Sequence, residues 1–396
     1  MRAVVAHYHE VGLKGRNRSS FEEALVRNAS GVLTDLGDIR FRRLPGRLVA
    51  ELPDGVDEAL VAERLKRVFG IQYFAIADAL PADPDHIGPA ALAALIAKPA
   101  SSFAVRGRVA HAEGFPWKSR DINEKIGARL VEATGMKVNL SEPERTVWVE
   151  VVGERAFVFG DRYEGPGGLP TGISGKVVVL LSAGLDSPVA AARMMRRGAT
   201  VELVHFHSQP FTDASSSRVA AEVAEHLNGF QRRLRLWLVP IGEAQREMSL
   251  ACPESLRTLL YRRHMMRVAA LIAEREGAHA LVTGDSLGQV ASQTLENLAA
   301  VEDASPIPVL RPLVGSDKIE IIDQSRRLGL EEISNAPCQE ACVLFEPKRP
   351  RTRASAEELR AAEEAVDVDA LAKGSLEGAE IRWFRFLHSA SDAASA

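Results

Sequence analysis

The stretch that decides the fold is KVVVLLSAGLDSPVAAARMMRRG, residues 176–198. Its first part, Val177 to Leu181, is an uncharged run of β-branched and leucine residues, which is typical of an inner parallel strand. A turn of small residues comes next, and then a predicted helix from Pro188 to Gly198, with Ser187 as its N-cap. Backbone N–H groups and a helix N-terminus meet at the turn, so the stretch predicts a site for a phosphate-like anion.

The turn resembles SGGxDS, the pyrophosphate loop of the PP-loop ATPases, which cleave ATP between the α and β phosphates and attach AMP to a substrate oxygen. It reads Ser182, Ala183, Gly184, Leu185, Asp186, Ser187, with alanine in place of the first glycine. If that position needs φ > 0 or close approach of a phosphate, the methyl group costs about 1 kcal/mol or more. The Walker pattern GxxxxGK[ST] is absent from the sequence, which excludes an ordinary P-loop NTPase. The alternative is a Rossmann-like βα turn that binds no nucleotide.

Composition describes a globular protein large enough for two or three domains, with 396 residues, 46% of them hydrophobic. Neither a membrane-spanning run nor a signal peptide is found, and three cysteines suit a reduced compartment, so we expect a cytoplasmic protein without a membrane partner. The net charge is −4, but basic residues crowd the first half of the chain. This asymmetry predicts a local surface for a polyanion, although a solvated charged face is an equal alternative.

The order of strand and helix signals divides the chain into four segments. Residues 1–78 predict an α+β domain with helices on a small antiparallel sheet, including a helix Ser20 to Leu36 capped by Ser19 or Ser20. Residues 79–165 predict a second α/β unit, residues 166–175 a glycine-rich linker, and residues 176–396 a doubly wound parallel sheet whose ligands bind beyond the C-terminal strand ends.

Several motifs outside the turn are similar to bacterial tRNA 4-thiouridine synthetases, a family also known as thiamine-biosynthesis sulfurtransferases. They are YHEVGLKGRNRSSF (residues 8–21), FPWKSR (115–120) and the linker EGPGGLPTGISG (164–175). The resemblance implies a ferredoxin-like domain at 1–78, an RNA-binding THUMP domain at 79–165 and a PP-loop domain at 176–396. The candidate RNA-binding residues are Arg106, Phe115, Trp117, Lys118 and Arg120. The alternative for Phe115 and Trp117 is that they only cover the end of a helix.

Four strand ends are expected to form one nucleotide pocket. Main-chain groups of Leu180 and Leu181 lead into the loop of Ser182, Gly184, Asp186 and Ser187, and the strand ending at His205 and Phe206 is expected beside the adenine. Within VTGDSLGQVASQT (282–294), Gly284 lets the backbone approach a ligand, Asp285 can cap the next segment, and Gln289 and Gln293 are expected on one helix face. The family has glutamate where this chain has Asp285. By resemblance, Gly284, Gln293 and Arg262 contact the nucleotide, and Lys318 assists adenylation.

The segment NAPCQEACVLFEPKRPRT (335–352) has Cys342 where the family's catalytic cysteine stands. It is the candidate sulfur carrier, with a pKa that Lys348, Arg349 and Arg351 can lower. Either Cys338 or Cys252 is a candidate for resolving a disulfide, and each alone is also compatible with a buried thiol. The cysteine spacing does not favour an iron–sulfur cluster. No length remains for the rhodanese domain of larger family members, so direct loading of Cys342 by a cysteine desulfurase is expected.

The resemblance implies an ATP- and Mg²⁺-dependent tRNA uridine 4-sulfurtransferase that adenylates O4 of the uridine at position 8 and forms AMP and pyrophosphate. It further implies tRNA as partner, a homodimer, and a possible sulfur transfer to the sulfur-carrier protein of thiamine synthesis. Two alternatives remain open from the residues. One is a PP-loop ligase that adenylates another substrate, and the other is a non-catalytic THUMP protein whose ATPase has decayed, for which Ala183 is the warning sign.

Overall fold

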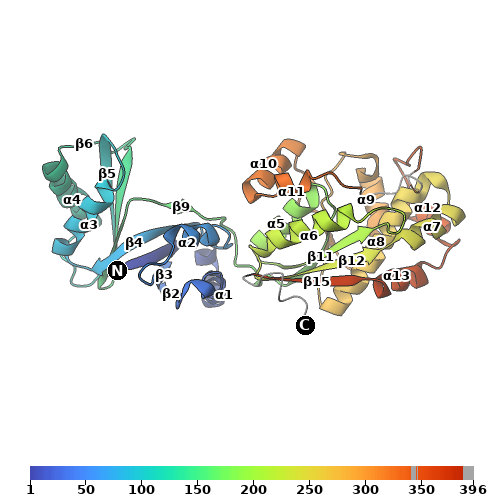
Figure 1. Ribbon diagram of the computed structural model, residues 1–396, viewed down its shortest axis with the longest axis horizontal. Helices are drawn as coiled ribbons and strands as arrows, with labels where there is room; N and C mark the ends of the chain where they lie inside the picture. The colour runs from blue at the N-terminus through green and yellow to red at the C-terminus, as the bar shows by residue number, and fades with distance from the viewer. Residues whose placement is uncertain (340–344, 346, 387–396) are drawn as a thin grey trace. The chain divides into compact units, whose positions relative to one another are not determined.

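The computed structural model describes residues 1–339, 345 and 347–386, and it divides into two compact units, residues 1–170 and 171–396. No helix among the described residues is both long and apolar enough to cross a bilayer. Figure 1 shows both units, with labels on many of their helices and strands.

The first unit is built on one nine-stranded sheet with the order β2-β3-β1-β4-β8-β7-β5-β6 and β9 beside β4. The strands are β1 (Arg2–His7), β2 (Arg42–Leu44), β3 (Arg47–Glu51), β4 (Tyr73–Pro81), β5 (Ser102–Ala110), β6 (Lys137–Val138), β7 (Arg145–Val152), β8 (Arg155–Phe159) and β9 (Tyr163–Glu164). The helices are α1 (Arg18–Gly31), α2 (Glu58–Leu65), α3 (Pro84–Ile96) and α4 (Ser119–Thr134).

The long strand β4 joins the two halves of this sheet, because Tyr73 to Asp78 pair with β1 and Asp78 to Pro81 pair with β8. The predicted small antiparallel sheet is therefore the front half of a larger one. The predicted boundary between residues 78 and 79 falls inside β4, and the domain boundaries stay predictions.

The sheet also bends. Four steps separate β3 from β7, roughly 19 Å in a flat sheet, yet Arg47 of β3 and Glu150 of β7 form a buried ion pair. His7 lies 3.1 Å from the same carboxylate. Burial raises the pKa of Glu150, but His7, Arg47 and Arg108 outweigh it, and the pKa is lowered overall.

The second unit is built on a six-stranded sheet with the order β14-β13-β10-β11-β12-β15, parallel except for β15 at one edge. The strands are β10 (Lys176–Leu180), β11 (Thr200–His207), β12 (Arg233–Pro240), β13 (Leu281–Val282), β14 (Val309–Leu310) and β15 (Glu380–Arg385). The helices are α5 (Asp186–Arg196), α6 (Ser215–Asn228), α7 (Gly242–Ala251), α8 (Arg257–Glu276), α9 (Leu295–Glu302), α10 (Lys318–Leu328), α11 (Glu331–Ser334), α12 (Ala356–Glu363) and α13 (Val368–Glu377).

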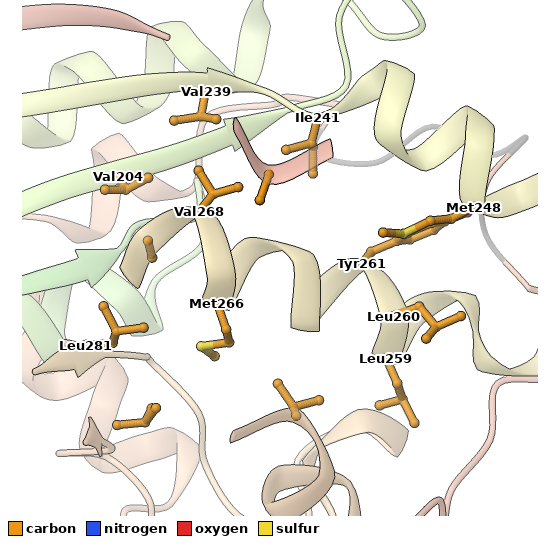
Figure 2. Packing of buried hydrophobic residues seen from close by; sticks show 14 of the residues in the cluster. Val204, Val239, Ile241, Met248, Leu259, Leu260, Tyr261, Met266, Val268 and Leu281 are labelled. Atoms are coloured by element: carbon orange, nitrogen blue, oxygen red, sulfur yellow. The ribbon is translucent and has the colours of Figure 1, made fainter. Parts of the chain in front are cut away.

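The order of the strands confirms the doubly wound parallel sheet. The chain runs from β10 to β11 and β12 on one side, and then returns to β13 and β14 on the other, so the strand order reverses between β10 and β13. Ligands of such sheets bind at this reversal, beyond the C-terminal strand ends. Helix α8 covers one face of the sheet, where Val268 and Met266 pack with Val204, Val239 and Leu281 (Figure 2).

Several local expectations are wrong, each because a side chain has another partner. Helix α1 begins at Arg18 instead of Ser20, and Ser20 donates to the carbonyl of Asn17 instead of capping. The helix expected to carry Gln289 and Gln293 begins only at Leu295, because Thr294 caps α9 by accepting from Asn297 N–H. Helix α7 lay outside the expectations altogether.

Candidate active site

The loop between β10 and α5 is closed by two serines. The Ser187 hydroxyl accepts from Ser182 N–H at 2.8 Å and lies 3.2 Å from the Ser182 hydroxyl, which accepts from Gly184 N–H at 3.3 Å. Helix α5 accordingly starts at Asp186, and Ser187 lies within its first turn instead of capping it. The two serines fix the curve of a loop that leads into a helix N-terminus, which is the arrangement that binds phosphate groups.

Alanine at position 183 does not strain this loop. Ala183 has a negative φ, so the expected cost of a left-handed conformation is absent. Its methyl group is 1% exposed and so contributes to the core. Gly284 has a structural use besides the expected approach to a ligand. A Cβ there would lie 2.7 Å from Ser187 N, so the missing side chain lets the segment after β13 approach the start of α5.

Asp186 is the polar centre of the loop. Its Oδ1 accepts from Lys318 Nζ at 2.7 Å and its Oδ2 accepts from Gln289 Nε2 at 2.9 Å. The three residues come from the first turn of α5, the loop after β13 and the start of α10. The side chain of Asp186 is 19% exposed and that of Lys318 46%, so a lysine and a carboxylate meet at the surface of the 182–187 loop.

Arg193 holds the Lys318 segment against α5. Its guanidinium donates to the Pro312 carbonyl at 2.5 Å, to the Ser316 hydroxyl at 3.0 Å and to the Gln324 amide oxygen at 2.8 Å. Burial lowers the pKa of Arg193. Ser286 adds a bond to the Ser316 carbonyl at 2.8 Å. The position of Lys318 is therefore set by several long-range contacts.

Asp285 gathers two of the predicted nucleotide contacts. Its carboxylate accepts from Arg262 at 2.5 Å, from Gln293 at 3.1 Å and from the Thr283 hydroxyl at 2.7 Å. Burial raises the pKa of Asp285, but Arg262 and the three hydrogen bonds outweigh it and lower the pKa overall. Asp285 is 4% exposed and caps no helix, contrary to expectation.

The two glutamines do not share a helix face. Gln289 lies in a turn and reaches Asp186, whereas Gln293 ends a short 3-10 helix (Ala291–Gln293) and reaches Asp285. The two glutamines therefore donate to two different carboxylates, those of Asp186 and Asp285. Sequence reasoning missed the role of Asp285, and the available signal was an acidic residue directly after a strand and a glycine.

At the tip of β11, the two predicted residues face different ways. The ring of His205 is 2% exposed, with Nδ1 2.9 Å from the Leu181 carbonyl and Nε2 3.2 Å from the Ser216 hydroxyl. Burial lowers the pKa of His205 to about 4, so the ring is neutral at pH 7. A contact from the His205 side chain to a purine is thus incompatible with this packing, and only its main chain is available. Phe206 is half-buried against the cluster around α8.

The arginines of α8 divide into structural and site residues. Arg263 and Arg267 both bind the Glu363 carboxylate, and Arg263 is 1% exposed. Arg262 alone of these three reaches the loop after β13, where it also donates to the Ser292 hydroxyl at 3.1 Å. The structure thus brings the loop, Asp186, Lys318, Arg262, Gly284 and Gln293 to one edge of the sheet.

Similarity to known proteins extends over the whole chain. The family model described as "Thiamine biosynthesis protein (ThiI)" matches residues 172–368, "ThiI ferredoxin-like domain" matches 3–75, and "THUMP domain" matches 89–161. A "Probable tRNA sulfurtransferase" of Thermus thermophilus is 42% identical over 378 residues, covering 96% of this chain and 93% of its own.

The chain belongs to the ThiI family. A second relative of the same name, from Moorella thermoacetica, is 39% identical and covers 96% of this chain and 97% of its own. A crystal structure described as a 4-thiouridine synthetase–RNA complex with bound ATP superposes with a TM-score of 0.89 at 35% identity, covering 97% of this chain and all of the other. The expected order of ferredoxin-like, THUMP and PP-loop domains is confirmed.

The ThiI family's catalytic cysteine corresponds by resemblance to Cys342, which lies outside the described residues. Cys252 is 7% exposed, and burial raises the pKa of its thiol, so it fits a structural role better than a redox role. Cys338 is half-exposed, and it lines a shallow hollow with residues at the start of α6. The next residue, Gln339, donates its N–H to the Ser215 hydroxyl at 2.9 Å.

Four of the predicted RNA-binding residues of this ThiI-family chain lie at or just before the start of α4 in the first unit, and Arg106 lies on β5. Phe115 and Trp117 pack edge to face at 6.1 Å and touch the core under α3 and α4, which fits the simple role of covering a helix end. Arg120 pairs with Glu124 at 2.7 Å, and Arg106 donates to the Leu140 carbonyl at 2.6 Å. Lys118 precedes α4, and its N–H donates to Asp121. RNA binding by these residues stays a prediction.

Proposed function

We propose that the protein uses ATP to transfer sulfur to tRNA, converting the uridine at position 8 to 4-thiouridine. The observation that carries the proposal is the full-length likeness to a 4-thiouridine synthetase with RNA and ATP, at a TM-score of 0.89. The closed loop with Asp186 and Lys318 supports it independently, because such a loop suits the pyrophosphate part of ATP.

The first step forms a bond between uridine O4 and the α phosphorus, and pyrophosphate leaves. Backbone N–H groups of the 182–187 loop and the α5 N-terminus hold the departing pyrophosphate. Lys318 lies at the same loop, and its ammonium offsets the negative charge that develops there. Arg262 and Gln293 both donate hydrogen bonds to Asp285. We assign Arg262 and Gln293 to the α phosphate and ribose side of the nucleotide.

Magnesium fits this site through Asp186. Mg²⁺ usually binds one or two carboxylates together with substrate phosphates and water, and Asp186 is a partly exposed carboxylate at the phosphate loop. When bound, the metal would offset the charge of the phosphates. Among the described residues no cluster of three histidine, cysteine, aspartate or glutamate side chains forms a metal site of its own.

The second step delivers sulfur. The terminal sulfur of a persulfide on Cys342 attacks C4 and forms the C–S bond, and AMP leaves with the former O4. A second thiol then attacks Sγ of Cys342, which releases thiouridine and leaves a disulfide. Cys338 is the better candidate for that thiol, because Cys252 is buried and Cys338 is not. A cysteine desulfurase is the expected source of the persulfide.

The first unit is assigned to RNA docking, through the basic and aromatic residues at the start of α4. Such a surface binds the RNA backbone and weakens as salt rises. The family description "Thiamine biosynthesis protein" motivates a second sulfur acceptor, the sulfur-carrier protein of thiamine synthesis. A cytoplasmic location and a homodimer remain predictions.

The experiment is to incubate tRNA with ATP, cysteine, a cysteine desulfurase and the protein, and to measure 4-thiouridine by near-ultraviolet absorbance. Wild type should form it only when ATP is present. Cys342→Ser should bind ATP normally and form none, whereas Cys252→Ser should retain activity. Thiolation by the Cys342→Ser protein, or pyrophosphate release that needs a small molecule and ignores tRNA, contradicts the proposal and favours another PP-loop ligase.

A further inference from the structure

A small hollow lies beside the nucleotide site, between the start of α8, the Ala291–Gln293 turn and the segment 347–351. Its volume is about 280 Å³, and Thr258, Ala291, Ser292, Pro347 and Arg351 contribute to its wall. This is near the lower end of sizes for small-molecule sites in proteins. None of these residues was assigned to nucleotide or RNA binding from the sequence.

The hollow adjoins the predicted phosphate arginine. Thr258 and Arg262 are four residues apart and so lie on one face of α8. The Arg262 guanidinium donates to Ser292, which belongs to the wall of the hollow. Ala291 and Ser292 directly precede Gln293, the other predicted nucleotide contact. The hollow is therefore next to the nucleotide site, separated from it by the Arg262 and Ser292 side chains.

The opposite wall is a basic segment held in place by its backbone. Asn297, 0% exposed, accepts from Ala354 N–H at 3.0 Å and donates to the Arg351 carbonyl at 3.0 Å. Arg351 N–H also donates to the Ser255 carbonyl at 3.0 Å, and Thr294 donates to the Thr352 carbonyl at 2.8 Å. The Arg351 side chain is 52% exposed, with Nη2 3.3 Å from Glu358 Oε1 and Nε donating to the Arg353 carbonyl at 3.0 Å. A fixed backbone thus presents a partly exposed guanidinium, paired with Glu358, at the edge of the hollow.

We propose that this hollow receives the uridine base after it leaves the RNA stack, with Arg351 binding an adjacent phosphate. The inference rests on the proposed function. Enzymes that modify a base in folded RNA or DNA must bring it out of its stack and into a pocket. The base must reach both the α phosphate and the sulfur, and the hollow lies between Arg262 and the segment that comes after Cys342 in sequence.

The chemistry of the wall suits a pyrimidine. Hydroxyl groups of Thr258 and Ser292 offer hydrogen bonds to the edge of the base, and Ala291 with Pro347 offers apolar contact to its faces. Arg351 supplies a positive charge for a phosphate, which would take the place of its exposed partner Glu358. Thr258 also lies in the first turn of α8, a 20-residue helix whose N-terminus favours negative charge nearby.

Two pairs of variants test the proposal. Ala291→Phe fills the hollow, and its matched control Ala221→Phe fills a different hollow on α6, of about 390 Å³. Arg351→Gln removes the charge at the hollow, and its control Arg353→Gln removes a charge that is 81% exposed on the same segment. Each protein is measured for thiolation of tRNA, for equilibrium ATP binding, and for the signal of a fluorescent pyrimidine analogue at position 8 of the tRNA.

We expect Ala291→Phe to lower thiolation at least about 10-fold, to keep the ATP dissociation constant within about 2-fold, and to abolish the fluorescence change that wild type causes. Arg351→Gln should raise the KM for tRNA about 10-fold, and both controls should stay within about 2-fold of wild type. If thermal unfolding shows that the Ala291→Phe protein is not folded, the comparison of Arg351→Gln with Arg353→Gln tests the proposal alone.

Normal thiolation by Ala291→Phe and Arg351→Gln overturns the inference. Loss of ATP binding in Ala291→Phe also overturns it, because the hollow then belongs to ATP. Failure of wild type to form 4-thiouridine is a different result, since it contradicts the proposed function itself.

Discussion

The strand-end site of the second unit and the start of α4 in the first unit are held in different ways. In the strand-end site, side chains far apart in sequence bind one another. Asp186 meets Lys318 across 132 positions, and Arg193 meets Ser316 across 123. At the start of α4, Arg120 pairs with Glu124 within one helical turn. Groups that act on a transition state are fixed in advance by long-range contacts, whereas groups that bind a polyanion can stay exposed.

The largest effect is expected at Asp186 and Lys318. Lys318→Met or Asp186→Asn should lower kcat for thiolation by roughly 10² to 10³-fold, because each removes a charge fixed at the phosphate loop. The free energy of unfolding should change by less than about 1 kcal/mol, since the pair is partly exposed. Lys98→Met is the matched control, because Lys98 forms an exposed 2.9 Å pair with Asp161 in the first unit. Equal losses of kcat in Lys98→Met and Lys318→Met would contradict the difference between the strand-end site and the first unit.

Asp285 should affect stability and nucleotide binding together. Asp285→Ala leaves Arg262 with an uncompensated charge in a largely buried site, so the free energy of unfolding should fall by about 3 kcal/mol. ATP affinity should fall as well, because Arg262 and Gln293 lose their common anchor. Asp285→Glu should recover part of both, since the family has glutamate at this position. Chemical denaturation and equilibrium ATP binding measure the two effects, and unchanged ATP affinity in Asp285→Ala would remove Asp285 from the site.

The carboxylate of Asp285 also predicts the acid side of the stability curve. Its pKa is lowered in the folded protein, so its contribution is complete above the unfolded value of about 3.9 and is lost as pH falls through the folded value. Asp285→Asn should therefore flatten the loss of stability below about pH 4.

The loop of the strand-end site could be predicted because a short stretch of sequence determines its form, whereas the long-range contacts around it could not. The small residues of the 182–187 turn and the strand before it indicated the phosphate loop, and the order of βα units indicated which strand ends meet. The use of Ser187 as a bridge to Ser182 could not be predicted, because a serine before a helix serves equally well as a cap. The inward ring of His205 depends on Ser216 of the next helix, a contact that no spacing in the sequence reveals.

The same limit applies to Gly284 and to the front sheet. A glycine after a strand can admit a ligand or another backbone, and the 2.7 Å approach to Ser187, which shows the second use, could not be predicted from the sequence. The bend of the nine-stranded sheet brings Glu150 to Arg47, 103 positions earlier in the chain. The distribution of charge predicts that the basic residues in the first half of the chain lie on a surface, whereas Arg47 is only 1% exposed.

Two buried histidines in the second unit predict a graded effect of pH on the free energy of unfolding. Burial lowers the pKa of His205 and of His264 to about 4. The unfolded chain binds a proton near pH 6.5 and the folded protein does not, so stability falls as pH drops from about 6.5 to 4. The limit is about 3 kcal/mol for each histidine. Urea unfolding across this range should show a shallower slope for His205→Asn, and an unchanged slope would contradict the buried neutral ring.

The smallest effect is expected at Arg120. Arg120→Ala should change the free energy of unfolding by less than about 0.5 kcal/mol, because its side chain is 86% exposed. Affinity for tRNA should fall a few-fold, and the slope of log K against log salt should lose about one unit. Fluorescence anisotropy at several salt concentrations measures both, and Arg326→Ala on α10 is the control, since Arg326 is a 61% exposed arginine of the second unit that pairs with Glu331. Equal effects of both variants would show that the start of α4 is an ordinary charged surface.

The central claim, transfer of AMP to a uridine oxygen, is tested most directly by following that oxygen. tRNA carrying ¹⁸O at uridine O4 is thiolated in ordinary water, and the nucleotide products are analysed by mass spectrometry. The mechanism predicts one ¹⁸O in AMP for each 4-thiouridine formed and none in pyrophosphate. Thiolation that leaves AMP unlabelled, or that proceeds without AMP, would contradict it.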